Sequence, residues 1–327
     1  MSQIIPLETL TAPGGRHRGA LVAQPNAERV PEWLKVKTGK ARQTVHTGEL
    51  LEELNIVTVC EEARCPNIGE CWSHKTATFM IGGDRCTRNC GFCNIQTNRP
   101  LPLDATEPQR VAQAAQRLGL KYVVITSVDR DDLADGGSAH WIQTIEAVRE
   151  ALPDAKIEIL TPDFKGDWQQ VLAVAAIKPN VYNHNIETVP RLYKPVRPGS
   201  KYERSLELLQ RVKEFDAGIK TKSGLMVGLG EEMAEVIEVM RDLKAHKVDF
   251  VTIGQYLRPS PRHLPVQKYY HPDQFDELRV IGEEMGFAMV ASGPFVRSSY
   301  HAGEDFARAK PNKHETEDKR LETPRAP

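Results

Sequence analysis

The six cysteines of this 327-residue chain all lie between positions 60 and 93. They form two triplets, spaced C-x4-C-x5-C and then C-x3-C-x2-C: Cys60, Cys65 and Cys71, followed by Cys86, Cys90 and Cys93. Thiols that serve only as small core residues would be scattered along the chain. The clustering therefore predicts that these side chains share a chemical task.

Three kinds of site compete to explain the clustering. Disulfides are typical of small secreted domains, and this chain has no features of one. Zinc favours four ligands, commonly in C-x2-C pairs, and no histidine stands at a matching spacing. Thiolates spaced two to four residues apart can wrap an iron–sulfur cluster, and each triplet would leave one of four irons without a cysteine. These ligand preferences favour clusters, with zinc as the alternative.

The second triplet forms the stretch Cys86-Thr-Arg-Asn-Cys90-Gly-Phe-Cys93, with an aromatic residue, Phe92, before the last cysteine. A C-x3-C-x-aromatic-C loop after a predicted strand resembles the radical S-adenosylmethionine (SAM) superfamily. The resemblance implies a 4Fe–4S cluster on the three thiolates, with the amino and carboxylate groups of SAM on the open iron. It also implies that the reduced cluster cleaves SAM to a 5′-deoxyadenosyl radical. The three cysteines would then be catalytic, and Phe92 would lie at the cofactor.

The first triplet narrows the resemblance. C-x4-C-x5-C directly upstream of the loop, with Arg297-Ser298-Ser299-Tyr300 near the C-terminus, is similar to the lipoyl synthase family, over about residues 60–300. This implies insertion of two sulfur atoms, at C6 and C8 of an octanoyl chain on a carrier-protein lysine. A second 4Fe–4S cluster, on the first cysteine triplet, would supply the sulfur and be consumed. Unactivated C–H bonds require radical chemistry, so two SAM molecules are expected per product.

The resemblance also implies partners. They are octanoylated lipoyl-carrier domains (2-oxoacid dehydrogenase E2 subunits and the glycine cleavage H protein) and a ferredoxin- or flavodoxin-type reductant. Two other functions remain open: a methylthiotransferase-like radical SAM enzyme with two clusters, and a non-enzymatic iron–sulfur electron carrier. The former would usually add an RNA-binding domain, and the latter would saturate each cluster with four cysteines.

The fourth ligand of the first cluster is a separate question, because no seventh cysteine exists. A serine oxygen is harder and more easily displaced from iron than a thiolate, which suits a cluster that must release sulfur. Adjacent residues of an extended segment face opposite ways, so one serine is expected to reach iron. By resemblance we choose Ser299, with Arg297 near the cluster; the alternative is a surface loop with two hydroxyls.

Composition and charge exclude some classes of partner. The formal net charge is −1, so no global field attracts nucleic acid or anionic lipid. No apolar run approaches the length of a membrane span. The N-terminus lacks the basic and apolar regions of a signal peptide. Because free thiols and oxygen-sensitive clusters suit a reducing compartment, we expect a cytoplasmic protein that binds neither membrane nor nucleic acid.

Apolar runs alternate with amphipathic stretches from Thr76 onward, which predicts an α/β fold with parallel strands. Helices are expected between the strands; one starts at Thr106 and ends at Gly119, and another opens with a capping box, Ser200 and Glu203. A doubly wound sheet and a partial (β/α)6 barrel are both compatible with this order, and the resemblance implies the barrel. The predicted strands are 77–82, 122–128, 156–161, 181–186, 222–229 and 250–256, with an extra strand at 287–290.

The same pattern divides the chain into four parts. Residues 1–75 form an N-terminal extension with the first cysteine triplet, and residues 76–286 form the barrel. Residues 287–303 form a C-terminal extension that carries Arg297 to Tyr300, and both extensions are expected to cover the barrel mouth. Residues 304–327, almost devoid of large apolar side chains, are predicted to be a disordered tail.

Polar residues at the predicted strand ends are candidates for SAM binding, because reactive groups gather there in parallel barrels. By resemblance, Asp129 or Asp131 would hold the SAM ammonium group; the alternative is a solvated acidic loop. Alternation places Asn183, Asn185 and Glu187 on one face, where they either satisfy one another or bind the ribose or methionyl end of SAM. The neighbouring Lys194 and Arg197 are either surface charges or partners of the SAM carboxylate.

Overall fold

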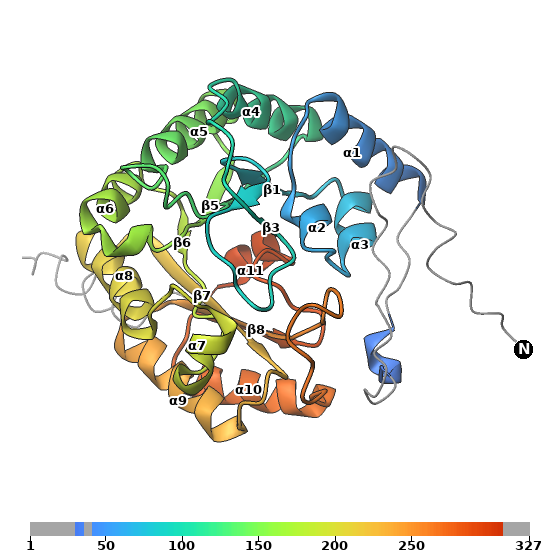
Figure 1. The fold of residues 1–327 in the computed structure, drawn as a ribbon, viewed down its shortest axis with the longest axis vertical. Coiled ribbons are helices and arrows are strands. Elements are labelled where there is room, and N and C mark those ends of the chain that lie inside the picture. Colours follow the sequence, from blue (N-terminus) through green and yellow to red (C-terminus); the bar gives the residue numbers. More distant parts are fainter. Residues whose placement is uncertain (1–29, 36–40, 310–327) are drawn as a thin grey trace, which may run out of the picture.

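The computed structural model describes residues 30–35 and 41–309. In this part of the chain, seven parallel strands form one curved sheet around a central interior, and helices surround it (Figure 1). Since all neighbouring pairs are parallel, the strands all end at one end of the barrel, the mouth, and begin at the other, the base. The strands, in spatial order, are β1 (Thr78–Ile81), β4 (Tyr122–Ser127), β5 (Lys156–Leu160), β6 (Val181–Asn183), β7 (Lys220–Val227), β8 (Phe250–Gln255) and β9 (Met289–Gly293).

The α/β partial barrel predicted from the sequence is confirmed. Strands such as β1 and β8 are buried at every position, as expected where helices cover the outside and side chains fill the interior. The extra strand is β9, which pairs with β8 and extends the sheet to seven strands. The barrel helices are α4 (Glu107–Leu118), α5 (Ser138–Ala151), α6 (Trp168–Ala176), α8 (Tyr202–Phe215), α9 (Met233–Ala245) and α10 (Pro272–Glu284).

The ends of two helices can be compared with the capping residues that the sequence predicted for them. Helix α4 begins after Thr106 and ends at Gly119, which has φ 68°, the left-handed conformation expected of a C-terminal glycine. The capping box predicted for α8 is wrong: the helix starts at Tyr202, after an N-cap residue without a side-chain hydrogen bond. The Ser200 hydroxyl instead accepts a hydrogen bond from Arg88 Nη1, at 3.4 Å. The Ser200 hydroxyl therefore binds Arg88, which is distant in the sequence, and does not cap the helix as the local pattern predicted.

The N-terminal extension supplies three helices beside β1: α1 (Ala41–Glu53), α2 (Val59–Glu62) and α3 (Ile68–Ser73). Thr47 of α1 donates a hydrogen bond to the carbonyl of Trp72 in α3, at 2.9 Å. Both residues are buried, which fixes α3 against α1. A short 3-10 helix, η2 (Glu32–Leu34), precedes them. Helix α1 thus precedes the first cysteine triplet and supports its second helix, and residues 1–29 and 36–40 lie outside the described part of the chain.

Two glycines let the C-terminal extension approach the inner side of the sheet. A side-chain carbon added at Gly254 of β8 would overlap the carbonyl oxygen of Val296. One added at Gly224 of β7 would lie 2.9 Å from the hydroxyl of Ser298. Residues 296–298 therefore pass close to β7 and β8 only because both positions lack a side chain.

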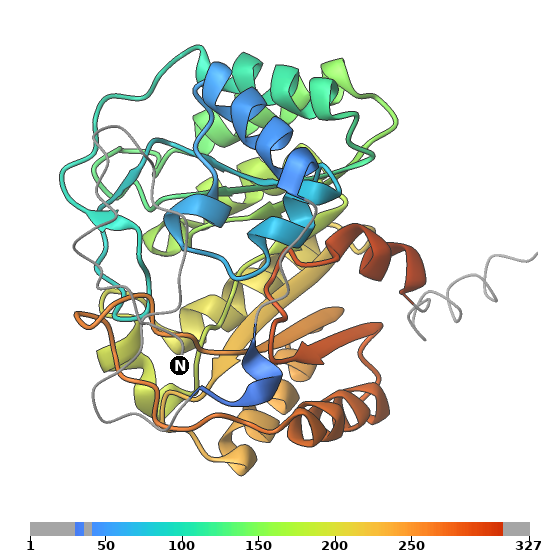
Figure 2. The same ribbon diagram turned by 90° about the vertical axis from the view of Figure 1, so that its right-hand side faces the viewer.

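The C-terminal end differs from its prediction in two respects. Residues Ala302–Arg308 form a helix, α11, so the first residues of the predicted disordered tail are ordered; residues 310–327 lie outside the described range. This helix packs at the base, away from the mouth, as Figure 2 shows. The Phe306 ring lies 5.7 Å from that of Tyr122 and 6.5 Å from that of Phe250, which begin β4 and β8. One aromatic side chain anchors this helix. A single such residue is not a periodic pattern, so the sequence did not predict the helix.

Candidate active site

The first cysteine triplet is built on two short helices and the turn between them. Cys60 lies in α2, Cys65 in the turn and Cys71 in α3. The backbone N–H of Cys65 donates to the Cys60 carbonyl, and that of Cys71 donates to the Asn67 carbonyl, both at 2.9 Å. The Asn67 side-chain amide donates to the carbonyl of Phe295, at 2.7 Å, and so ties the turn to the C-terminal extension.

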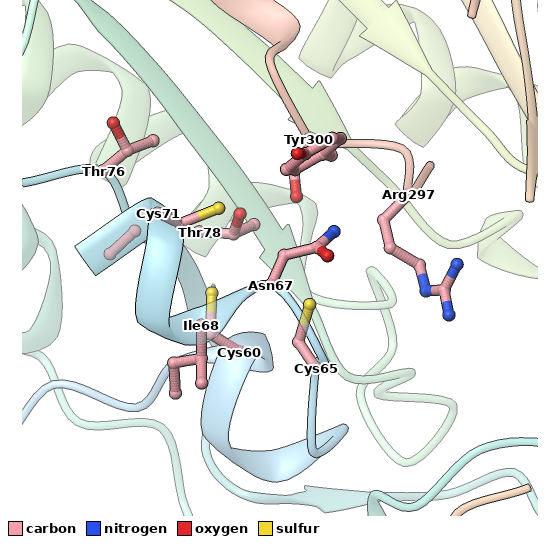
Figure 3. A pocket seen from close by; sticks show the side chains of 11 residues that line it. Cys60, Cys65, Asn67, Ile68, Cys71, Thr76, Thr78, Arg297 and Tyr300 are labelled. Carbon is pink, nitrogen blue, oxygen red and sulfur yellow. The ribbon is translucent and has the colours of Figure 1, made fainter. Parts of the chain in front are cut away.

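The three cysteines line one pocket together with the C-terminal extension. Figure 3 shows their sulfur atoms around a common hollow, with Arg297 and Tyr300 on the side of the extension. Ser299 also lines this pocket, and the Tyr300 hydroxyl donates to the Glu70 carboxylate at 3.0 Å. Residues more than two hundred positions apart in the chain thus line one pocket, and Arg297 and Ser299 are among them. That Ser299 binds iron remains a prediction.

Burial favours the neutral form of the thiols in this pocket. Burial raises the pKa of Cys60 to about 12 and also raises the pKa of Cys65, although the guanidinium of Arg297 acts in the opposite direction on Cys65. Thiols that resist ionisation alone must lose their protons on binding a metal centre, which then supplies the positive charge. A cationic side chain beside them suits a site whose loaded form carries negative charge.

The second triplet begins at the last residue of the very short strand β2 (Arg85–Cys86) and continues in the loop before β3 (Gln96–Thr97). The sulfur of Cys86 accepts hydrogen bonds from the backbone N–H groups of Arg88 and Asp129, at 3.4 and 3.3 Å. The loop is also held at Gly91, where an added side-chain carbon would lie 2.9 Å from the Pro195 carbonyl oxygen. The cysteine loop is therefore fixed to the end of β4 and to the segment after β6.

Arg88, which lies inside the cysteine motif, connects this loop to the ends of neighbouring strands through hydrogen bonds. Its guanidinium makes two hydrogen bonds to the Asp131 carboxylate, at 2.8 and 2.9 Å, and one to Asp163, at 2.6 Å. Asp163 is fully buried and also pairs with Arg204 of α8. Burial alone would raise the pKa of Asp163, but the hydrogen bond from Arg88 holds it at about 2. Asp131 is thus held by two hydrogen bonds, whereas Asp129 has only a longer ion pair with Arg88, at 3.3 Å, and is the less engaged of the two carboxylates.

A second group of polar side chains lies beside Cys90. The Asn185 amide donates to Glu187 at 3.0 Å, and its oxygen accepts from the Ser298 hydroxyl at 2.9 Å. Burial raises the pKa of Glu187, whereas the Arg197 guanidinium lowers it. Burial also raises the pKa of Cys90 to about 11, against the opposing effect of Arg197. Opposite charges therefore gather where the sequence predicted the SAM site.

Other predicted positions have different surroundings. Asn183 is buried deeper in the barrel, with its amide 3.4 Å from the carboxylate of Glu158, so it belongs to an internal polar layer. Phe92 packs against the apolar cluster of Val196, Leu229 and Tyr256. It supports the loop from this cluster, and a contact with the cofactor remains a prediction.

The structure also separates the two basic residues that the sequence left open. Lys194 is exposed, whereas Arg197 is buried and donates to the backbone carbonyl of Asn185, at 2.7 Å. This places Arg197, rather than Lys194, at the candidate site. The sequence did not identify Arg88 and Asp163 as residues of the site. Arg88 could have been recognised as an arginine between two predicted cysteine ligands in a chain with several aspartates at its strand ends.

The residues present fit the groups that the sequence implies. Buried atoms beside the second triplet that lack a hydrogen-bond partner in the described residues include Asp129 Oδ1, which lies 3.3 Å from Arg88 Nε in an ion pair, and Arg197 Nε. A carboxylate and a guanidinium with remaining hydrogen-bonding capacity match the ammonium and carboxylate of an amino acid such as the methionyl end of SAM. In the described ranges, no three His, Cys, Asp or Glu side chains converge on a single metal ion. A four-iron cluster does not require this, because each thiolate binds a different iron.

Comparison with known proteins assigns the family. A model of the radical SAM superfamily matches residues 80–243, half of the chain, which include the second cysteine triplet and the strands up to β7. The chain belongs to the radical SAM superfamily. Membership makes the protein an enzyme and implies SAM and one 4Fe–4S cluster as its cofactors.

Solved radical SAM structures share the barrel. Methylornithine synthase (PylB) is 16% identical in sequence, with 75% of this chain and 74% of that chain covered and a TM-score of 0.51. The FeFe-hydrogenase maturase HydG from Carboxydothermus hydrogenoformans is 15% identical, with 83% and 70% covered and a TM-score of 0.52. At these identities the likeness is one of fold. No helix in the described part of this radical SAM protein is both long and apolar enough to cross a membrane.

Proposed function

We propose that this protein is a lipoyl synthase, which inserts two sulfur atoms at C6 and C8 of a protein-bound octanoyl-lysine. The observation that carries the proposal is that the C-terminal extension reaches both cysteine triplets. Arg297 and Ser299 line the pocket of the first triplet, and the hydroxyl of Ser298, between them, donates a hydrogen bond to Asn185, in the group of polar residues beside Cys90. A substrate carbon held near Arg297 would have a radical source on one side and a sulfur source on the other.

Each triplet has a distinct task in this proposal. Cys86, Cys90 and Cys93 would hold the cluster that binds SAM, while Arg197 orients the SAM carboxylate and Asp129 its ammonium group. Asn185 and Glu187 would bind the ribose or the methionyl end. When bound, SAM and the reduced cluster would supply a carbon radical reactive enough to take a hydrogen atom from an unactivated C–H bond. The protein positions the chain and keeps water out of the site.

Cys60, Cys65 and Cys71, with Ser299 as the proposed fourth ligand, would hold a second 4Fe–4S cluster, which acts as the sulfur-donating substrate. The pocket suits this role because one wall belongs to the C-terminal extension, separate from the helices that carry the thiols. A hydroxyl on that wall can leave iron without moving the cysteines. Arg297, on the same wall, would compensate the negative charge of the loaded site.

One experiment tests the function directly. The anaerobically reconstituted enzyme is mixed with reductant, excess SAM and an octanoylated carrier domain, and products are measured by mass spectrometry. We expect a lipoyl group on the lysine and two molecules of 5′-deoxyadenosine per lipoyl group. Formation of 5′-deoxyadenosine without sulfur insertion would leave the radical SAM assignment intact and reject lipoyl synthase. A methylthio group on RNA or protein would instead indicate a methylthiotransferase-like enzyme.

A further inference from the structure

Three loops at the barrel mouth carry basic residues without acidic ones. They are residues 85–101, 188–201 and 256–270, which follow β1, β6 and β8 and contain no Asp or Glu. The loops meet at Gly91, which donates a backbone hydrogen bond to Val196, at 2.9 Å, and accepts one from Leu264, at 3.0 Å. The three loops therefore form one continuous surface.

Five exposed side chains on this surface form what we call the basic face: Arg99, Lys194, Lys201, Arg262 and Lys268. None of the five forms an ion pair with another residue in the described ranges, although Arg99 lies near enough to Asp132 to help Arg130 lower the pKa of that carboxylate. Their number and their position around one opening produce a local positive field, even though the whole chain is nearly neutral.

Most of the described acidic residues at the same end of the barrel have partners within the protein. After β7, Glu231 accepts hydrogen bonds from the backbone N–H groups of Gly228 and Leu229, and Glu235 pairs with Arg191, whereas Glu232 is exposed. In the loop after β4, Arg88 binds Asp131 and Arg130 binds Asp132. Asp135 accepts hydrogen bonds from the backbone N–H groups of Gly137 and Ala139. Carboxylates paired within the protein attract a partner much less than unpaired ammonium and guanidinium groups do.

We propose that the basic face docks an acidic protein domain, the carrier that presents the acylated lysine to the mouth. The inference rests on the proposed function, because a chain attached to a protein must enter from a surface on which that protein can lie. An apolar contact is also present: Leu101, with 60% of its surface exposed, is in the first of the three loops. Exposed apolar and basic groups side by side suit a protein–protein interface.

A nucleic acid fits this surface less well. Proteins that bind single strands stack bases on exposed aromatic rings. In the three loops, the aromatic rings of Tyr193, Tyr256 and Tyr270 are buried, and Phe92 is packed in the apolar cluster with Tyr256. Tyr269 is half-buried and is the remaining tyrosine of these loops. Positive charge with so little accessible aromatic surface indicates a folded acidic partner.

The test reverses two charges on the basic face and two elsewhere. The test variant is Lys201→Glu with Arg262→Glu, which changes two of the three loops. The control is Lys121→Glu with Lys156→Glu, two exposed lysines at the base of the barrel. Each variant is assayed with an octanoylated acidic carrier domain and with a short, uncharged peptide that contains octanoyl-lysine.

For the test variant we expect KM for the carrier domain to rise about tenfold at low ionic strength, because surface charges steer association and are screened by salt. Its kcat, its KM for the peptide and its rate of SAM cleavage should stay within about twofold of wild type, as should every value for the control. Added salt should reduce the difference between wild type and test variant. An unchanged KM for the carrier, or an equal rise in the control, would overturn the proposal.

Measuring binding directly tests the docking surface independently of the proposed enzymatic function. The affinity for the octanoylated carrier domain is measured by calorimetry without SAM, with a single-stranded RNA oligonucleotide as a second probe. Weaker carrier binding in the test variant supports docking even if no lipoyl group forms, in which case only the proposed function fails. Tight RNA binding that the test variant loses, with carrier binding unchanged, would overturn the proposal in favour of a nucleic-acid surface.

Discussion

Arg88 lies between two cysteines of the second triplet in the sequence, and its side chain binds the carboxylates of Asp131 and Asp163. Asp163 has no exposed side-chain surface, so removing the guanidinium leaves a buried charge short of one partner. We expect Arg88→Met to lower the free energy of unfolding by about 3 kcal/mol, as for one partner of a buried pair. Urea unfolding of the anaerobic, cluster-free protein measures it.

The matched control for this prediction is Arg191→Met, which breaks the more exposed pair of Arg191 with Glu235. An exposed pair contributes less than about 1 kcal/mol, so the control should unfold close to wild type. Equal losses in the two variants would mean that Arg88 does not fasten the cysteine loop.

Ser298 and Ser299 are neighbours with different surroundings. Ser299 lines the pocket of the first triplet, whereas the Ser298 hydroxyl donates to Asn185. We expect Ser299→Ala to reduce lipoyl formation at least about tenfold while SAM cleavage persists, since it removes the proposed iron ligand. Ser298→Ala removes one hydrogen bond, at a cost of about 1 kcal/mol, and should have a smaller effect. The reverse result would assign the ligand role to Ser298.

Elements far apart in the chain come together because backbones approach closely, as they do at Gly254. The carbonyl of Val296 occupies the space of a side chain there, so Gly254→Ala should displace residues 296–298 and, with them, Arg297 and Ser299. We expect loss of sulfur insertion with SAM cleavage largely retained. Hydrogen exchange of residues 295–301 should increase, and unchanged exchange with full activity would contradict the prediction.

The control is Gly293→Ala in β9, which pairs with Gly254. An added side-chain carbon at Gly293 lies 3.4 Å from a methyl group of Val296, an ordinary contact. This variant should therefore retain both activities. If both alanines abolished sulfur insertion, general damage to the sheet would explain the loss better than displacement of the extension.

Elements with a periodic local signal could be predicted from the sequence, and elements held by distant contacts could not. Strand β8 is a short apolar run, and Gly119 marks the end of α4, so both were placed within a few residues. Helix α11 depends on one ring, Phe306, that meets strands far away in the chain.

The candidate site follows the same division. The cysteine spacing identified both triplets, because ligands of one cluster are close in sequence. The choice between Lys194 and Arg197 depended on which side chain the folded loop buries beside Cys90. The sequence around these two residues does not indicate which of them is buried.

The whole molecule holds the triplets on separate parts of the fold, one on α2, α3 and the turn between them, the other on the end of β2 and the loop before β3. Under the proposed function, each part would take up a cluster independently. We expect about eight irons per chain in the anaerobically reconstituted protein, from four per triplet. Iron and sulfide analysis with Mössbauer spectroscopy measures this. Bound zinc with little sulfide would reject the cluster assignment of the first triplet.

Independent loading leads to the last prediction, a division of labour between the triplets. Replacing Cys86, Cys90 and Cys93 with alanine should abolish 5′-deoxyadenosine formation, because these residues lie in the loop matched to the radical SAM superfamily. Replacing Cys60, Cys65 and Cys71 should abolish lipoyl formation yet leave SAM cleavage measurable, because the groups beside Cys90 are unchanged. Each triple variant should retain about four irons, which serves as the folding control. If the second variant still inserted sulfur, the first triplet would not be the sulfur source, and the proposed function would lose its basis.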